Sequence, residues 1–170
     1  MLNELTTGIR GPLLIILLSV ALLLTAFAFE HLGGLNPCIL CIYQRIPYFL
    51  NIIIAIAALL LIFFGSQKFA GLLIILCGMV FFVGGIIAMY HVGIEQHWWT
   101  GIASCSGIPA GTVESVEEMR KMLQSTPVIR CDEIAWSMFG ISLSGYNLLA
   151  SLTLGLFSFF SAKTLLKRPT

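Results

Sequence analysis

The sequence predicts an all-α integral membrane protein, built as a bundle of four transmembrane helices with one long loop outside the membrane. Of its 170 residues, 58% are hydrophobic and 10% are charged, and its mean hydropathy is +0.99. These values lie far from those of average soluble domains. Because about 20 apolar residues cross a bilayer as a helix, four crossings use most of the chain, and we expect a single membrane domain over residues 1–170.

Four apolar runs have the length of a span, at about residues 12–29, 46–64, 69–90 and 141–162. The first begins with Pro12, which suits the first turn of a helix. It is also too long, and too poorly followed by small residues, for a cleaved signal peptide, so we expect it to be retained. Helices satisfy their own backbone hydrogen bonds in lipid, and the runs lack the alternation of barrel strands.

The spans leave a short loop over residues 30–45 and a long polar loop over residues 91–140 on one side. Trp98 and Trp99 follow the third span, as in the aromatic belt of a membrane interface. Residues 112–123 predict a short amphipathic helix, with acidic residues in its first half and basic residues in its second. This helix either lies on the membrane surface or is a solvated loop helix, and its sequence fits both.

Basic residues near the ends of the spans favour both chain termini in the cytoplasm. The terminal and turn segments on that side carry Arg10, Lys68, Lys163, Lys167 and Arg168, against Arg45, Arg120, Lys121 and Arg130 in the two loops opposite. Disulfides persist on the oxidising side of a membrane, which in a bacterial cell is the periplasm. Both loops are therefore expected in the periplasm. The net charge of +1 provides no electrostatic basis for nucleic-acid binding.

Two pairs of cysteines are the chemically informative residues. Cys38 and Cys41 form a Cys-x-x-Cys motif after Asn36-Pro37, and Cys105 and Cys131 lie in the long loop. One hairpin through the membrane separates the pairs, so both are expected on the same side, where they could exchange disulfides. The fifth cysteine, Cys77, lies inside the third span and is expected to be an inert, buried hydrophobic residue.

A Cys-x-x-Cys motif can be a redox dithiol, half of a zinc site or part of a haem attachment site. Haem attachment needs His directly after the second cysteine, where this chain has Ile42. A zinc site would need a second closely spaced ligand pair, which Cys105 and Cys131 do not provide, so no metal site is predicted. Two purely structural disulfides remain an alternative, because oxidising compartments form them routinely.

Arg45 favours the redox interpretation. Cys41 is expected at the start of the second span, where the helix dipole lowers the pKa of a thiol, and Arg45 follows one turn later on the same face. A reactive thiolate at Cys41 is thereby favoured. Arginine also donates hydrogen bonds to carbonyl oxygens, so a flat, lipid-soluble quinone could dock there. The alternative for Arg45 is ordinary snorkelling to the membrane interface.

The motif Cys38-Ile-Leu-Cys41-Ile-Tyr-Gln-Arg45 closely resembles that of the DsbB family of bacterial disulfide bond formation proteins. The four spans, the later cysteine pair and His91 at the end of the third span carry the same resemblance, which covers roughly residues 11–160. It implies a quinone-dependent thiol oxidase of the bacterial inner membrane.

By this resemblance, electrons pass from a reduced, periplasmic, DsbA-like thioredoxin-fold protein to Cys105/Cys131. They continue to Cys38/Cys41 and then to ubiquinone or menaquinone in the membrane. The resemblance also places Arg45 and His91 at the quinone. His91 has an alternative as an interfacial histidine that caps the span.

Three other functions are alternatives to a quinone-dependent thiol oxidase. An enzyme of the vitamin K epoxide reductase type would close a late span with its dithiol, whereas Cys38/Cys41 open the second span. A non-enzymatic membrane scaffold with structural disulfides would need neither Arg45 nor an exchangeable cysteine pair. A membrane haem protein would have to use His31, His91 or His97, whose scattered positions make facing axial ligands hard to arrange.

Overall fold

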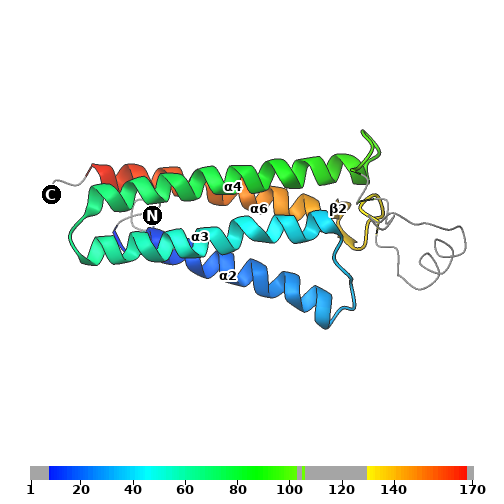
Figure 1. Ribbon diagram of the computed structural model, residues 1–170, viewed down its shortest axis with the longest axis horizontal. Helices are drawn as coiled ribbons and strands as arrows, with labels where there is room; N and C mark the ends of the chain where they lie inside the picture. The colour runs from blue at the N-terminus through cyan, green and yellow to red at the C-terminus, as the bar shows by residue number, and fades with distance from the viewer. Residues whose placement is uncertain (1–7, 103–104, 106–129, 168–170) are drawn as a thin grey trace, which may run out of the picture.

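The computed structural model describes residues 8–102, 105 and 130–167. Four long helices run side by side along its long axis (Figure 1): α2 (Arg10–His31), α3 (Ile39–Phe63), α4 (Gln67–Glu95) and α6 (Leu143–Leu166). Each is long and apolar enough to cross a membrane. The predicted four-helix membrane bundle is therefore confirmed.

Two helices extend beyond the apolar runs that predicted them, and this changes the location of two site residues. Helix α3 begins at Ile39 rather than near residue 46, and α4 ends at Glu95 rather than near residue 90. Arg45, expected one turn after Cys41, and His91, expected at the end of the third span, are thus helical, although the approximate loop bounds 30–45 and 91–140 included them. Hydropathy fell at these polar residues, but the helices continue because the side chains find polar partners inside the bundle.

Small residues let the helices approach closely. Helix α4 packs along both α3 and α6, and α2 packs mainly on α3. A Cβ atom added at Gly84 would lie 3.1 Å from the side chain of Pro47 on α3, and one added at Gly78 would lie 3.1 Å from the ring of Phe159 on α6. These contacts are the close backbone approach expected of glycine in membrane helices.

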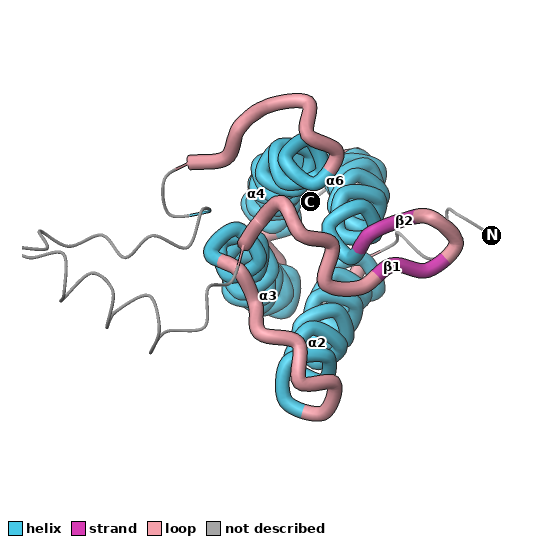
Figure 2. Tube along the Cα trace, turned by 90° about the vertical axis from the view of Figure 1, so that its right-hand side faces the viewer, coloured by secondary structure: helices cyan, strands magenta, loops and turns pink. Residues whose placement is uncertain are grey.

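One end of the bundle carries the functional segments. There α2 leads into α3, and a small antiparallel hairpin of β1 (Ser137–Met138) and β2 (Ile141–Ser142) leads into α6. Figure 2 shows the segment before β1 crossing this end of the bundle. The sequence analysis did not predict the hairpin, because strands of two residues are too short to show an alternating pattern. The predicted helix over residues 112–123 lies outside the described residues.

Candidate active site

The Cys-x-x-Cys pair forms the start of α3. Pro37 disfavours a helical conformation at its neighbours, and Cys38 is extended and caps the helix, its Sγ accepting a hydrogen bond from the Cys41 backbone N–H at 3.3 Å. Both thiols are free, and their sulfur atoms lie 2.9 Å apart. Cys38 is buried, whereas Cys41 is partly exposed. The two sulfurs are thus positioned for reversible disulfide formation.

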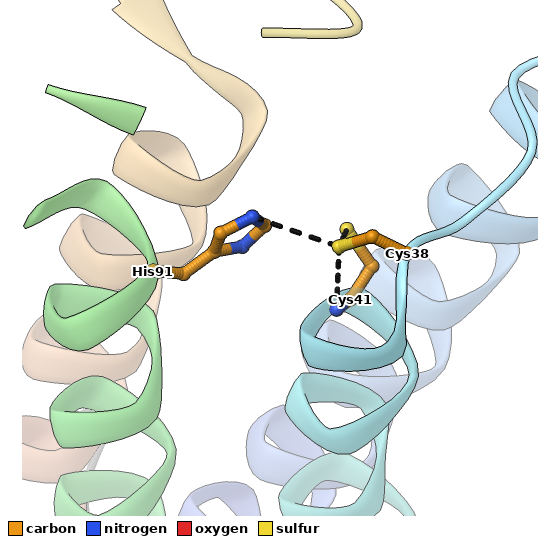
Figure 3. Close-up of side chains that lie close together, drawn as sticks. All are labelled: Cys38, Cys41 and His91. Carbon is orange, nitrogen blue, oxygen red and sulfur yellow. Dashed lines mark hydrogen bonds between the residues drawn. The ribbon is translucent and has the colours of Figure 1, made fainter. Parts of the chain in front are cut away.

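His91 reaches this pair from a different helix. It lies on the last turns of α4, is 3% exposed, and directs Nε2 at Cys38 Sγ over 3.6 Å (Figure 3). Its other ring nitrogen, Nδ1, lies 2.8 Å from Gln44 Nε2 on α3. The ring therefore has a polar neighbour on each side, which fixes its orientation toward the dithiol.

Hydrogen bonds continue from Gln44 into the membrane bundle. Asn147 Nδ2 on α6 donates to Gln44 Oε1 at 2.5 Å, and Tyr48 donates its hydroxyl to Asn147 Oδ1 at 2.5 Å. Tyr48 also lies 2.9 Å from the hydroxyl of Ser151. The sequence analysis missed this network, although the spacing of four residues between Gln44 and Tyr48 inside an apolar run placed both on one helix face.

Glu95 is a second residue that the sequence analysis missed. It ends α4, is 8% exposed, and accepts hydrogen bonds through Oε2 from the hydroxyls of Ser142, at 2.5 Å, and Ser144. Its other oxygen, Oε1, lies 3.8 Å from His91 Nε2. Both oxygens of this buried carboxyl group thus have polar neighbours at the end of the bundle that carries the dithiol.

Arg45 turns toward α2. Its guanidinium donates to Glu30 Oε2 at 2.5 Å and lies 4.9 Å from the ring centre of Phe27. The side chains of Arg45 and Glu30 are 15% and 24% exposed, so this ion pair is largely shielded from water. Arg45 and Cys41 both line one cavity, described below, but Arg45 is anchored there by α2. Glu30 and Phe27 were not singled out from the sequence.

Electrostatics distinguish the two thiols. The pKa of Cys38 is lowered to about 4, first by the hydrogen bond from the Cys41 thiol and then by the hydrogen bond and charge of His91, against the opposing effect of burial. The sequence analysis had favoured Cys41 as the thiolate. In the reduced pair the donors converge on Cys38 instead, because it occupies the cap position at which the free N–H groups of the helix point.

A cavity of about 310 Å³ opens beside the dithiol, between α2, α3 and α6. An apolar wall of the cavity is formed by Leu22, Ala26 and Phe29 of α2. Cys38 and Cys41 also line the cavity. Its polar lining comes from groups already described, chiefly Arg45, Gln44, Asn147 and His91. The cavity therefore combines a large apolar surface with a few convergent polar groups, as small-molecule sites do.

The second cysteine pair is a disulfide, Cys105–Cys131, at the same end of the bundle. Both residues are almost fully buried and pack with Cys38, Leu40 and Ile94 in one group, which we call the cysteine cluster. All four predicted redox cysteines thus meet in one small apolar environment. Cys77 is buried elsewhere, in the main core of the bundle.

A second hollow, of about 440 Å³, lies on the outer side of the disulfide. Trp98, Trp99, Cys105 and Arg130 contribute to its lining. Trp99 stacks on Tyr90 and donates its indole N–H to the backbone oxygen of that residue at 3.0 Å. The tandem tryptophans, expected as membrane anchors, therefore also border the disulfide.

Comparison with known proteins identifies the family of the chain. The family described as "Disulfide bond formation protein DsbB" matches residues 10–161. The chain is 30% identical to disulfide bond formation protein B of Methylobacillus flagellatus over 93% of this chain and 95% of the relative. The corresponding protein of Xylella fastidiosa is 34% identical, over 76% and 77%. An uncharacterized protein of Rickettsia prowazekii is 31% identical, over 85% and 82%.

No solved structure matches the chain significantly. The family match covers α2, α3, α4, most of α6 and both cysteine pairs. The chain therefore belongs to the DsbB family of disulfide bond formation proteins.

Proposed function

We propose that this chain is a quinone-dependent disulfide oxidoreductase of the bacterial inner membrane, and that it reoxidises a periplasmic, DsbA-like thioredoxin-fold protein. The observation that carries the proposal is that Cys38 and the Cys105–Cys131 disulfide pack in one cluster beside a partly apolar cavity. The family supports a disulfide-forming role. The opposite end of the bundle bears Lys68, Lys163 and Lys167, which favours that end in the cytoplasm and the cysteines in the periplasm.

The first exchange takes place at the outer disulfide. A thiolate of the reduced partner attacks Cys105, which forms a mixed disulfide and releases Cys131 as a thiolate. Cys131 attacks Cys38 of an oxidised Cys38–Cys41 pair, forms a Cys38–Cys131 disulfide and releases Cys41 as a thiolate. By acidity alone, Cys38 would be the better leaving group. Cys38 is nevertheless taken as the sulfur under attack, because it packs with Cys131 in the cysteine cluster.

The second exchange restores the outer disulfide. The remaining thiol of the partner attacks the mixed disulfide and leaves as oxidised protein, which frees Cys105. Cys105 attacks Cys131 and displaces Cys38, so that Cys105–Cys131 is oxidised and the inner pair is reduced. The pairing of Cys105 with Cys131 and the free thiols of Cys38 and Cys41 are compatible with this product.

The cavity suits a quinone as the electron acceptor. Apolar side chains of α2 would pack against a flat ring, and Arg45 and Asn147 contribute to the lining hydrogen-bond donors from which carbonyl oxygens can accept. A quinone, ubiquinone or menaquinone, supplies a two-electron, two-proton acceptor. In this proposal Arg45 orients the carbonyl group, and His91, beside Cys38, holds or accepts the proton that a thiol loses.

The test is quinone reduction by purified protein with a reduced thioredoxin-fold donor. Cys38→Ser and Cys41→Ser should each abolish reduction of the quinone. Cys105→Ser should abolish turnover with the protein donor, yet leave the inner pair able to pass electrons from a small dithiol to the quinone. Cys77→Ser is the matched control and should retain full turnover, because Cys77 lies in the main core. Equal, mild losses in all four variants would contradict the relay.

A further inference from the structure

The reduced dithiol and His91 form a cluster of metal-ligating atoms that the order of the sequence concealed. Sγ of Cys38, Sγ of Cys41 and Nε2 of His91 all lie within 4.8 Å of one another. The zinc site considered from sequence failed for lack of a nearby histidine or second cysteine pair. Packing of α4 against α3 brings His91 beside the dithiol, although it lies 53 positions after Cys38 in the sequence.

We propose that the reduced Cys38/Cys41 pair and His91 bind one thiophilic divalent cation of the Zn²⁺ and Cd²⁺ class, and that this cation holds the enzyme in its reduced state. The inference goes beyond the proposed function and does not depend on it, since it needs only the free thiols and the imidazole.

The sulfur-to-nitrogen distance fits such an ion, whereas the sulfur-to-sulfur distance has to increase. Bond lengths of about 2.3 Å to sulfur and 2.0 Å to nitrogen in a tetrahedral zinc site separate a sulfur from a nitrogen ligand by about 3.5 Å. Cys38 Sγ and His91 Nε2 lie 3.6 Å apart. The two sulfurs, now 2.9 Å apart, would have to separate to about 3.8 Å. Rotation of the partly exposed Cys41 side chain provides that movement.

Three protein ligands leave one position of a tetrahedral site unfilled, and Glu95 lies near that position. Glu95 Oε1 lies 3.8 Å from His91 Nε2, while Oε2 is held by Ser142 and Ser144, so one carboxylate oxygen is directed at the cluster. Because Glu95 lies outside the group of atoms within 4.8 Å of one another, a water held by this carboxylate takes the fourth position. Binding displaces the thiol protons, and the divalent cation neutralises the charge of the resulting thiolates.

Gln44 contacts the histidine ligand on the side of the ring that faces away from the cation. Its amide contacts His91 Nδ1 at 2.8 Å. When a cation occupies Nε2 of a neutral ring, Nδ1 carries the proton. If the Gln44 and Asn147 amides both turn by half a rotation, Gln44 offers its oxygen to that proton and donates to Asn147, which in turn donates to the Tyr48 hydroxyl. Partners of this kind contribute about 10-fold to 100-fold to the metal affinity of a site.

Binding is gated by the redox state of the pair. A disulfide between Cys38 and Cys41 removes both thiolate ligands, so only the reduced protein binds the cation, with release of the thiol protons. Conversely, sulfurs bound to the cation cannot form the disulfide. Zn²⁺ should therefore inhibit oxidation of the pair by any acceptor, reversibly with a chelator.

The experiment is a Cd²⁺ titration of the reduced full-length protein in detergent, followed by sulfur-to-cadmium charge-transfer absorption. A Cys105→Ser, Cys131→Ser background removes the other exchangeable thiols. One Cd²⁺ should bind per chain, displaced by Zn²⁺, and oxidation should abolish binding. Gln44→Ala should weaken the affinity about 10-fold and His91→Ala more strongly. Cys77→Ser, which alters a buried cysteine outside the cluster, is the matched control and should bind normally.

Several results would overturn the proposal: no charge-transfer band in the reduced protein, undiminished affinity in His91→Ala, or loss of binding in Cys77→Ser. X-ray absorption of Zn²⁺-loaded protein with all native cysteines tests it without any variant. Two sulfur ligands with nitrogen or oxygen at the remaining positions are expected. Four sulfur ligands would refute the site, because they would mean that Cys105 and Cys131 bind the ion instead. Failure of quinone reduction would leave these readouts unchanged, so the two proposals fail separately.

Discussion

His91→Ala should raise the pKa of Cys38 and make the inner disulfide a weaker oxidant. The pKa of Cys38 lies at about 4, against an ordinary value of 9.0, and His91 lowers it both through its hydrogen bond and through its charge. A lowered thiol pKa favours the thiolate at neutral pH, and so stabilises the reduced pair relative to the disulfide. Removing the imidazole removes part of that stabilisation.

The size of the effect follows from the contact that is lost. A hydrogen bond to a charged group contributes about 1.5–3 kcal/mol, and one pKa unit corresponds to about 1.4 kcal/mol. His91→Ala should therefore raise the pKa of Cys38 by about one to two units. It should not restore the ordinary value, because the hydrogen bond from the Cys41 thiol, the largest contribution, remains.

The assay is the rate of Cys38 alkylation in reduced protein as a function of pH, read by mass spectrometry of the cysteine-bearing peptide. Between about pH 6 and pH 8 a thiol with the ordinary pKa gains about 100-fold in thiolate, whereas wild-type Cys38 should react at a nearly constant rate. In His91→Ala the rate at pH 6 should fall to as little as about half of that at pH 8. His31→Ala, at the C-terminal end of α2, is the control. A wild-type rate that climbs 100-fold, or a variant profile identical to wild type, would refute this account of the site.

Three further predictions concern groups around the site. Glu30→Gln should free the Arg45 guanidinium from its anchor on α2 and change the Michaelis constant for quinone about 3-fold to 10-fold, with little effect on that for the protein donor, measured by steady-state kinetics. Ser144→Ala should leave Glu95 with one hydroxyl donor fewer and lower the free energy of unfolding by about 1–3 kcal/mol, measured by denaturation in detergent; an unchanged stability would contradict the buried carboxylate. Gly93→Ala should displace the Trp99 ring, which occupies the space of the added Cβ, and should raise the Michaelis constant for the protein donor while sparing oxidation of small dithiols.

Much of this protein could be predicted from the sequence because the bilayer restricts the choices so strongly. In lipid, the backbone hydrogen bonds of four apolar runs of spanning length can be satisfied only if the runs are helices. The four-helix bundle could therefore be predicted from hydropathy alone. The same constraint put Cys38/Cys41 and Cys105/Cys131 at one end, since a single hairpin separates them. The Cys-x-x-Cys-x-x-x-Arg motif then indicated the family, which the comparisons confirm.

Only the tertiary structure decided which polar groups meet. Hydropathy placed the ends of the predicted spans beside Gln44, Arg45 and His91. Packing shields these polar side chains between helices, so α3 and α4 extend past the predicted ends. Glu95 next to Ser142 and Ser144, and Glu30 on Arg45, are contacts between separate helices, and they depend on helix rotation and depth, which hydropathy does not specify. The pKa of Cys38 is lowered first by the hydrogen bond from the neighbouring Cys41 thiol and then by His91, and the second contribution depends on how another helix is packed.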